Sequence, residues 1–178
     1  MRDAWQLRRD FLLYAKIKYM EFLSKSVAET AKIAANFAEA TLAKPKSTMA
    51  TIVGLYGELG SGKTTFMKYL AKAFGIEETI KSPTFVIMKI YDLTPRFASP
   101  SPCQGEGKGE VYSLIHIDAY RIEKEEEMLN LGWQEIISDP RNLICIEWAD
   151  KIAGIMPSHI VIKFEHVDES SRRINIKL

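Results

Sequence analysis

The fold of this chain is decided by one stretch, Gly57-Glu58-Leu59-Gly60-Ser61-Gly62-Lys63-Thr64. It matches the pattern G-x-x-x-x-G-K-[ST], which is typical of phosphate-binding loops. Glycines let the backbone turn its N–H groups inward, where they form an anion site together with the start of the next helix. We expect Lys63 to reach the β- and γ-phosphates of a nucleotide and Thr64 to place its hydroxyl on Mg²⁺. The residues from Gly57 to Thr65 are therefore the predicted nucleotide-binding segment.

The residues on either side of this loop favour a phosphate-binding loop over a flexible glycine turn. Residues 51–56 form a short, mostly apolar run, which predicts a strand that enters the loop. Residues 65–74 predict a helix, with Gly75 as its expected C-cap. The apolar side chains of this helix at helical spacing are Phe66, Leu70, Ala73 and Phe74. A strand, a glycine loop and a helix in this order are the parts of a nucleotide-binding unit.

Composition indicates one globular domain in a reducing compartment. The chain has 178 residues, 47% of them hydrophobic, and a formal net charge of +1. This near-zero charge argues against a strongly electrostatic nucleic-acid binder acting alone. Cys103 and Cys145 are far apart and lack the spacing of a zinc site or a disulfide framework, and Cys145 lies in an apolar run as a predicted core residue. No apolar run approaches membrane-spanning length, so we predict a cytoplasmic protein without membrane partners.

The predicted domain covers residues 20–178 and carries two unusual segments. Residues 1–19 are basic and lack a clean apolar stripe, so we interpret them as an N-terminal extension or tail before an alternative start at Met20. A membrane-surface helix is a further alternative. Residues 92–110 are rich in proline and glycine, which favours a disordered, low-complexity insertion over a functional lid.

The remaining patterns predict an α/β fold. A capping box at Ser26 and Glu29 opens a helix, whose expected apolar face comprises Val27, Ala31, Ala34, Phe37, Ala38 and Leu42. Residues 123–131 predict a further helix that stops at Gly132. The predicted strands are 21–23, 85–91, 111–117, 143–146, 159–165 and 172–178. We expect a three-layer fold of the P-loop NTPase type, with a mixed, partly parallel central sheet and a C-terminal antiparallel hairpin from the last two strands.

Two of the apolar strands end in an acid, Asp118 and Glu147. Ligands of an open α/β sheet collect at the carboxyl ends of the strands, where the phosphate loop also lies. We therefore expect Asp118 to hold Mg²⁺ through water, together with Thr64. Glu147 would support the ion or orient the attacking water, which makes it catalytic together with Lys63 and Asp118. The alternative is that one acid only caps a turn.

Four further residues near these acids are candidates for the site. Ser82 and Thr84 precede a predicted strand and form a switch-like segment, in which Thr84 contacts the γ-phosphate or merely starts the strand. Trp148 is a candidate to stack on the nucleotide base or a partner, although burial is the commoner fate of a tryptophan. His116 is interpreted as a core or site-wall histidine and not as a metal ligand.

The chain resembles the TsaE (formerly YjeE) family from about Phe22 to Leu178. The resemblance is carried by the phosphate loop and by four short stretches: Ser82-Pro-Thr-Phe85, His116-Ile-Asp-Ala-Tyr-Arg121, Leu131-Gly132 and Glu147-Trp148. The members are small bacterial P-loop ATPases that are needed to make threonylcarbamoyl-adenosine in tRNA. The family's members usually start near Met20 and have a much shorter connection where residues 92–110 stand here.

The resemblance implies a substrate, partners and residue roles. The nucleotide would be ATP with Mg²⁺, and the partners would be the TsaD and TsaB proteins, with tRNA reached indirectly through their assembly. Hydrolysis would reset that assembly between turnovers. Lys63, Thr64, Asp118 and Glu147 would carry the family's phosphate, magnesium and hydrolysis roles. Trp148 falls in the family's Glu-Trp motif and Thr84 in its switch-like segment.

Two other functions are compatible with a phosphate loop. A small-molecule kinase would need an acceptor pocket and usually an arginine-bearing lid, for which Arg96 in the insertion is thin support. A GTP-dependent binding switch would be expected to carry an N-K-x-D base-reading motif, and the sequence has none.

Overall fold

The computed structural model describes residues 19–43, 47–78, 80, 82–83, 86–93, 111 and 113–178. In these residues the chain forms one seven-stranded mixed sheet with the strand order β1-β7-β6-β2-β5-β4-β3. Its strands are β1 (Tyr19–Ser24), β2 (Thr51–Tyr56), β3 (Met88–Asp92), β4 (Ser113–Asp118), β5 (Asn142–Glu147), β6 (Ile160–His166) and β7 (Arg172–Lys177). The predicted mixed, partly parallel sheet is confirmed.

The centre of the sheet is parallel and its edges are antiparallel. β2 pairs in parallel with β5 and β6, and β5 pairs in parallel with β4. β3 and β1 add antiparallel edges, and β6 and β7 form the predicted C-terminal hairpin. The carboxyl ends of β2, β4 and β5 therefore meet at one edge of the sheet, where ligands of such sheets bind.

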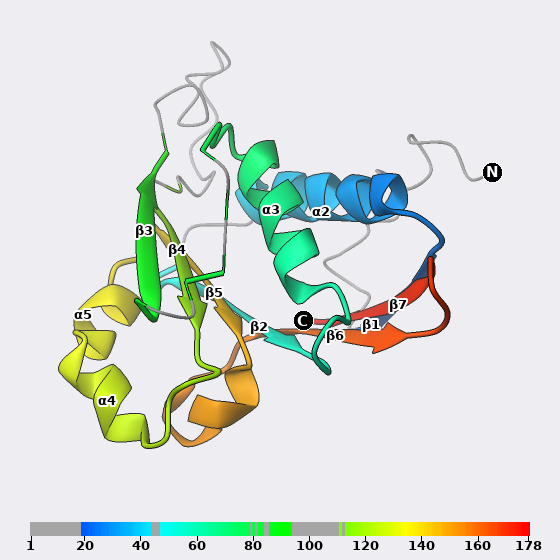
Figure 1. Ribbon diagram of the computed structural model, residues 1–178. Coiled ribbons are helices and arrows are strands. Elements are labelled where there is room, and N and C mark those ends of the chain that lie inside the picture. The colour runs from blue at the N-terminus through cyan, green and yellow to red at the C-terminus, as the bar shows by residue number, and fades with distance from the viewer. Residues whose placement is uncertain are drawn as a thin grey trace, which may run out of the picture.

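Helices cover both faces of the sheet and complete the predicted three layers (Figure 1). α2 (Val27–Leu42) and α3 (Lys63–Ala73) pack on one face, while α4 (Glu125–Asn130), α5 (Trp133–Ser138) and the 3₁₀ helix η2 (Ala149–Ile155) lie on the other. Side chains of β2 alternate between two cores: Val53 packs in the α2–α3 core and Ile52 in the core around Trp133. This period of two is the geometry of a strand buried on both faces.

The helix after the phosphate loop agrees closely with its prediction. α3 buries the predicted Phe66 and Leu70. After it, Gly75 has φ +78°, its N–H donates to the Lys72 carbonyl, and the Ile76 N–H donates to the Ala71 carbonyl. These are the two hydrogen bonds of a Schellman motif, so Gly75 ends the helix as expected.

The buried face of α2 differs from the predicted one. Val27, expected on the apolar face, is 56% exposed. Thr30 and Thr41 are buried in its place, because their hydroxyls find partners: Thr30 shares a hydrogen bond with Ser24 Oγ (2.8 Å), and Thr41 donates to the Phe37 carbonyl (2.9 Å). Ser26 is the N-cap as predicted, accepting from the Glu29 N–H.

Four elements differ from the sequence prediction: two have other bounds and two were not expected. The strand predicted at 85–91 begins only at Met88, because a turn holds the N–H groups of Val86 and Ile87 on the Pro83 carbonyl and puts Ile87 at φ +64°. The helix predicted at 123–131 covers Glu125–Asn130. α5 and η2 were not predicted.

The two unusual segments stay predictions. Residues 1–18 and 94–110 lie outside the described residues. Tyr19, placed in the predicted extension, pairs with Lys177 as the first residue of β1. In the described part of the chain, no helix has the length and apolar character needed to cross a membrane.

Candidate nucleotide-binding site

The phosphate loop connects β2 to α3 and depends on its glycines. Gly57 has φ +142°, and a Cβ built there would lie 2.4 Å from the Phe164 carbonyl oxygen, so no other residue fits. Gly60 and Gly62 also have positive φ, but a Cβ at Gly60 would meet nothing within 4 Å. Gly62 is the N-cap residue of α3, and no side chain caps the start of this helix. The loop thus leaves open space beside an uncapped helix N-terminus, which suits an anion.

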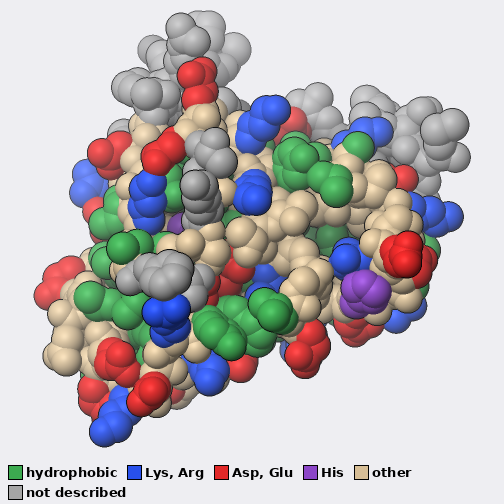
Figure 2. All heavy atoms as spheres, viewed as in Figure 1, with side chains coloured by type: hydrophobic (Ala, Val, Ile, Leu, Met, Phe, Trp, Pro, Cys, Tyr) green, Lys and Arg blue, Asp and Glu red, His purple; other side chains and the backbone are tan. Residues whose placement is uncertain are grey.

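A cavity of about 390 Å³ opens beside this loop. The side chains and backbone that line it come from the loop, α3 and the ends of β4 and β5: Leu59, Gly60, Gly62, Lys63, Thr64, Thr65, Ser82, Asp118, Tyr120, Glu147 and Trp148. Figure 2 shows acidic side chains inside a hollow near the middle of this face and hydrophobic side chains along its lower rim. A cavity of this size is typical of small-molecule sites.

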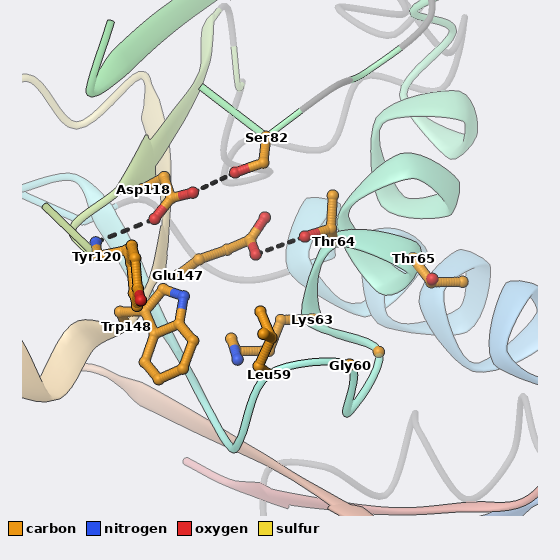
Figure 3. A pocket seen from close by; sticks show the side chains of 11 residues that line it. Leu59, Gly60, Lys63, Thr64, Thr65, Ser82, Asp118, Tyr120, Glu147 and Trp148 are labelled. Atoms are coloured by element: carbon orange, nitrogen blue, oxygen red, sulfur yellow. Dashed lines mark hydrogen bonds between the residues drawn. The ribbon is translucent and has the colours of Figure 1, made fainter. Parts of the chain in front are cut away.

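Lys63 extends from the start of α3 back over the loop (Figure 3). Its Nζ donates to the carbonyls of Gly57 and Glu58 (3.0 Å to Glu58) and lies 3.8 Å from the centre of the Trp148 ring. Burial lowers the pKa of Lys63, while the charges of Glu147 and Asp118 oppose that shift. A buried ammonium group between loop carbonyls and two acids is the cation that a phosphate group would meet.

The two strand-end acids lie side by side, because Asp118 and Glu147 are partners in the β4–β5 register. Thr64 Oγ1 donates to Glu147 Oε2 at 2.6 Å, and His116 Nε2 lies 2.9 Å from Glu147 Oε1. Asp118 accepts from the Ser82 hydroxyl and from the Tyr120 N–H (3.0 Å). The structure therefore brings both acids, Thr64 and Ser82 to one cavity, as the sequence predicted.

This set of oxygen atoms fits Mg²⁺. The described residues contain no cluster of three or more histidine, cysteine or acidic side chains that could hold a metal ion. They do place two carboxylates and the Thr64 hydroxyl at one cavity. Magnesium is usually bound through one or two carboxylates, keeps several waters and takes further ligands from substrate phosphates.

An aromatic pair forms one wall of the cavity. Trp148 follows Glu147 with φ +59°, a strained value for a tryptophan. Its backbone N–H donates to the Leu55 carbonyl at 3.2 Å. Its ring lies 5.1 Å from that of Tyr120, which is 52% exposed. Tyr120 was missed from the sequence, although its position two residues after a strand-end acid was a usable signal.

Some predicted site residues lie outside the cavity lining. Gly57 and Glu58 contribute carbonyls that accept hydrogen bonds from Lys63, and Ser61 is a buried residue of the loop. Thr84 lies outside the described residues, so its switch role stays a prediction. Cys145 is buried, and burial raises the pKa of its thiol, as expected for an inert core cysteine.

Comparison with known proteins gives the family. The family model described as "Threonylcarbamoyl adenosine biosynthesis protein TsaE" matches residues 24–174. The chain belongs to the TsaE family. A tRNA threonylcarbamoyladenosine biosynthesis protein TsaE from Rickettsia bellii is 33% identical over 155 residues, which cover 86% of this chain and 94% of that protein. The TsaE protein of Aquifex aeolicus is 29% identical over 159 residues, covering 88% and 98%.

A solved structure shows the same fold. The crystal structure of YdiB from Bacillus subtilis superposes with a TM-score of 0.63 at 28% sequence identity, covering 89% of this chain and 84% of that one. The expected P-loop NTPase-type architecture therefore holds over most of the molecule.

Proposed function

We propose that this protein is a magnesium-dependent ATPase that serves the threonylcarbamoyl-adenosine modification of tRNA. One observation carries the ATPase part: Lys63, Thr64, Asp118 and Glu147, from α3, β4 and β5, converge on one cavity beside the phosphate loop. Membership of the TsaE family supports the tRNA-modification part.

The loop and Lys63 would bind the phosphates. The start of α3 has no side-chain cap, so its backbone N–H groups and the helix dipole would attract a phosphate anion. Lys63 would then donate its hydrogen bonds to phosphate oxygens in place of the two loop carbonyls. Its positive charge would then neutralise charge that develops on the γ-phosphate during transfer to water.

The two carboxylates have different proposed roles, magnesium binding and activation of water. Asp118 is held by Ser82 and by a backbone N–H, and with Thr64 it would hold Mg²⁺, which supplies charge neutralisation for the phosphates. Glu147 would orient the attacking water and accept its proton. The Trp148–Tyr120 wall would pack against the base of the nucleotide.

Family membership supports the proposed partners and location. We propose that the protein works in the cytoplasm with the TsaD and TsaB proteins, reaches tRNA through their assembly, and uses hydrolysis to reset it. Because the loop segment itself contributes no arginine, turnover by the isolated protein should be slow.

Phosphate release by the purified protein tests the ATPase proposal. We expect release from ATP only with Mg²⁺, loss of release in Glu147→Gln, and weaker binding of GTP than of ATP. Transfer of the γ-phosphate to a nucleoside or sugar would instead identify a kinase. Equal GTP and ATP affinities would favour a GTP-dependent switch.

A further inference from the structure

His116 makes a buried contact with Glu147. The side chains of His116 and Glu147 are 0% and 3% exposed, and His116 Nε2 lies 2.9 Å from Glu147 Oε1. Both residues project toward the α3 side of the sheet, since Cys145, the register partner of His116, packs in the α2–α3 core. A carboxylate oxygen accepts, so Nε2 is the donor in this bond.

The two oxygens of Glu147 are held from different elements. Oε1 meets His116 on β4, and Oε2 accepts the Thr64 hydroxyl from α3. Thr64 also faces the cavity, where its hydroxyl is available to a bound ligand (Figure 3). The His116 contact is on the other oxygen, and both of its side chains lie in the protein interior.

The second ring nitrogen of His116, Nδ1, makes no hydrogen bond to the described residues. Nδ1 is also buried. A buried polar atom without a partner costs free energy, which an aliphatic side chain among Leu114, Leu143 and Cys145 would avoid. The gain from a histidine at this position is therefore its single bond to Glu147.

We propose that His116 is a positioning residue, which fixes the Glu147 carboxylate in the orientation needed to act on the attacking water. This inference rests on the proposed ATPase function. It assigns His116 no contact with the nucleotide, so loss of His116 should slow turnover and leave substrate binding nearly intact.

Two substitutions at His116 separate positioning from packing. The amide nitrogen of His116→Gln reaches about as far as Nε2 and can donate to Glu147, whereas that of His116→Asn is too short. We expect His116→Asn to lower kcat for ATP about 10- to 100-fold, as loss of an orienting partner commonly does, with KM and nucleotide affinity nearly unchanged. His116→Gln should restore most of kcat.

The matched control is His159→Asn. His159 bonds Tyr56 at 2.7 Å and does not line the cavity, so its replacement should leave kcat unchanged. A cycle with Glu147→Gln adds a second readout: if His116 acts through Glu147, His116→Asn costs little further single-turnover rate in that background.

Retained kcat in His116→Asn, or equal losses in the asparagine and glutamine variants with a raised KM, would overturn the positioning role. If His116→Asn does not fold, His116→Gln decides alone: kcat within roughly threefold of wild type supports the role, and a larger loss contradicts it. Wild-type protein without hydrolysis, or full activity in Glu147→Gln, would instead refute the proposed ATPase function itself.

Discussion

Lys63 illustrates how one residue connects the loop with the acids. Its ammonium group is buried, contacts two loop carbonyls and faces Trp148. Burial lowers its pKa, and the charges of Glu147 and Asp118 oppose that shift most strongly. In the proposed function, a cation held in this way would already lie where the phosphates bind, so little reorganisation would accompany binding.

Replacing Lys63 by alanine should therefore weaken ATP binding strongly. A hydrogen bond to a charged group contributes about 1.5–3 kcal/mol, which corresponds to a loss of affinity of roughly 10- to 100-fold. Isothermal titration calorimetry measures it. Lys68→Ala, an exposed lysine on the same helix, is the control and should bind ATP normally. Unchanged affinity in Lys63→Ala would show that the phosphates bind elsewhere.

Asp118 should govern the magnesium dependence of nucleotide binding. We expect ATP with Mg²⁺ to raise the melting temperature of the wild type more than ATP alone, because a ligand that binds only the folded state stabilises it. Asp118→Asn should lose that additional shift, since an amide is a poorer ligand for Mg²⁺. Asp92→Asn, an exposed acid at the end of β3, should keep it. A retained shift in Asp118→Asn would contradict the assignment.

The sequence predicted these residues better than it predicted their neighbours. Lys63, Thr64, Asp118 and Glu147 follow from a motif and from strand-end positions, which are local patterns. The His116–Glu147 bond and the Tyr120–Trp148 contact join residues about 30 positions apart, so they depend on the β4–β5 register. No local pattern gives that register directly.

At the scale of elements, long periodic segments were predictable and short ones were not. The spacing of apolar residues identifies α3, but α5 has six residues and its stability comes from burying Trp133 against the sheet. β3 begins later than predicted, because the Pro83 carbonyl accepts hydrogen bonds from two N–H groups just before the strand. Tertiary contacts of this kind override local propensity.

The loop and the C-terminal hairpin are packed together at Gly57. Gly57→Ala would force a Cβ to within 2.4 Å of the Phe164 carbonyl on β6 at a backbone conformation that suits only glycine. We expect a loss of at least about 2 kcal/mol in the free energy of unfolding, measured by denaturant titration. In Gly60→Ala the new Cβ would have no atom within 4 Å, so the free energy of unfolding should fall by only about 1 kcal/mol, which is the cost of the positive φ. Equal losses would show that strain, and not the hairpin contact, decides.

At the scale of the whole molecule, Asp92 belongs to β3 and Leu93 is buried in the core, but the sheet order explains why residues 94–110 need not contribute to stability. β3 and β4 are antiparallel neighbours, and Asp92 pairs with Ser113, so the two ends of the connection between these strands lie one strand spacing apart. A short turn can close such a gap.

Deleting residues 95–109 should therefore leave the melting temperature nearly unchanged. The stretch has little apolar content, and the loop it would leave is shorter and slightly cheaper to close. Differential scanning calorimetry of the deletion variant beside the full chain measures the effect. A large drop would show that the insertion packs on the domain.

The role proposed for this protein is ATP hydrolysis in the service of tRNA modification. Mass analysis of tRNA nucleosides after depletion of the protein, with wild type or Lys63→Ala supplied in its place, tests this role most directly. We predict that threonylcarbamoyl-adenosine falls on depletion, recovers with the wild type and does not recover with Lys63→Ala. An unchanged level of this nucleoside after depletion would contradict the account.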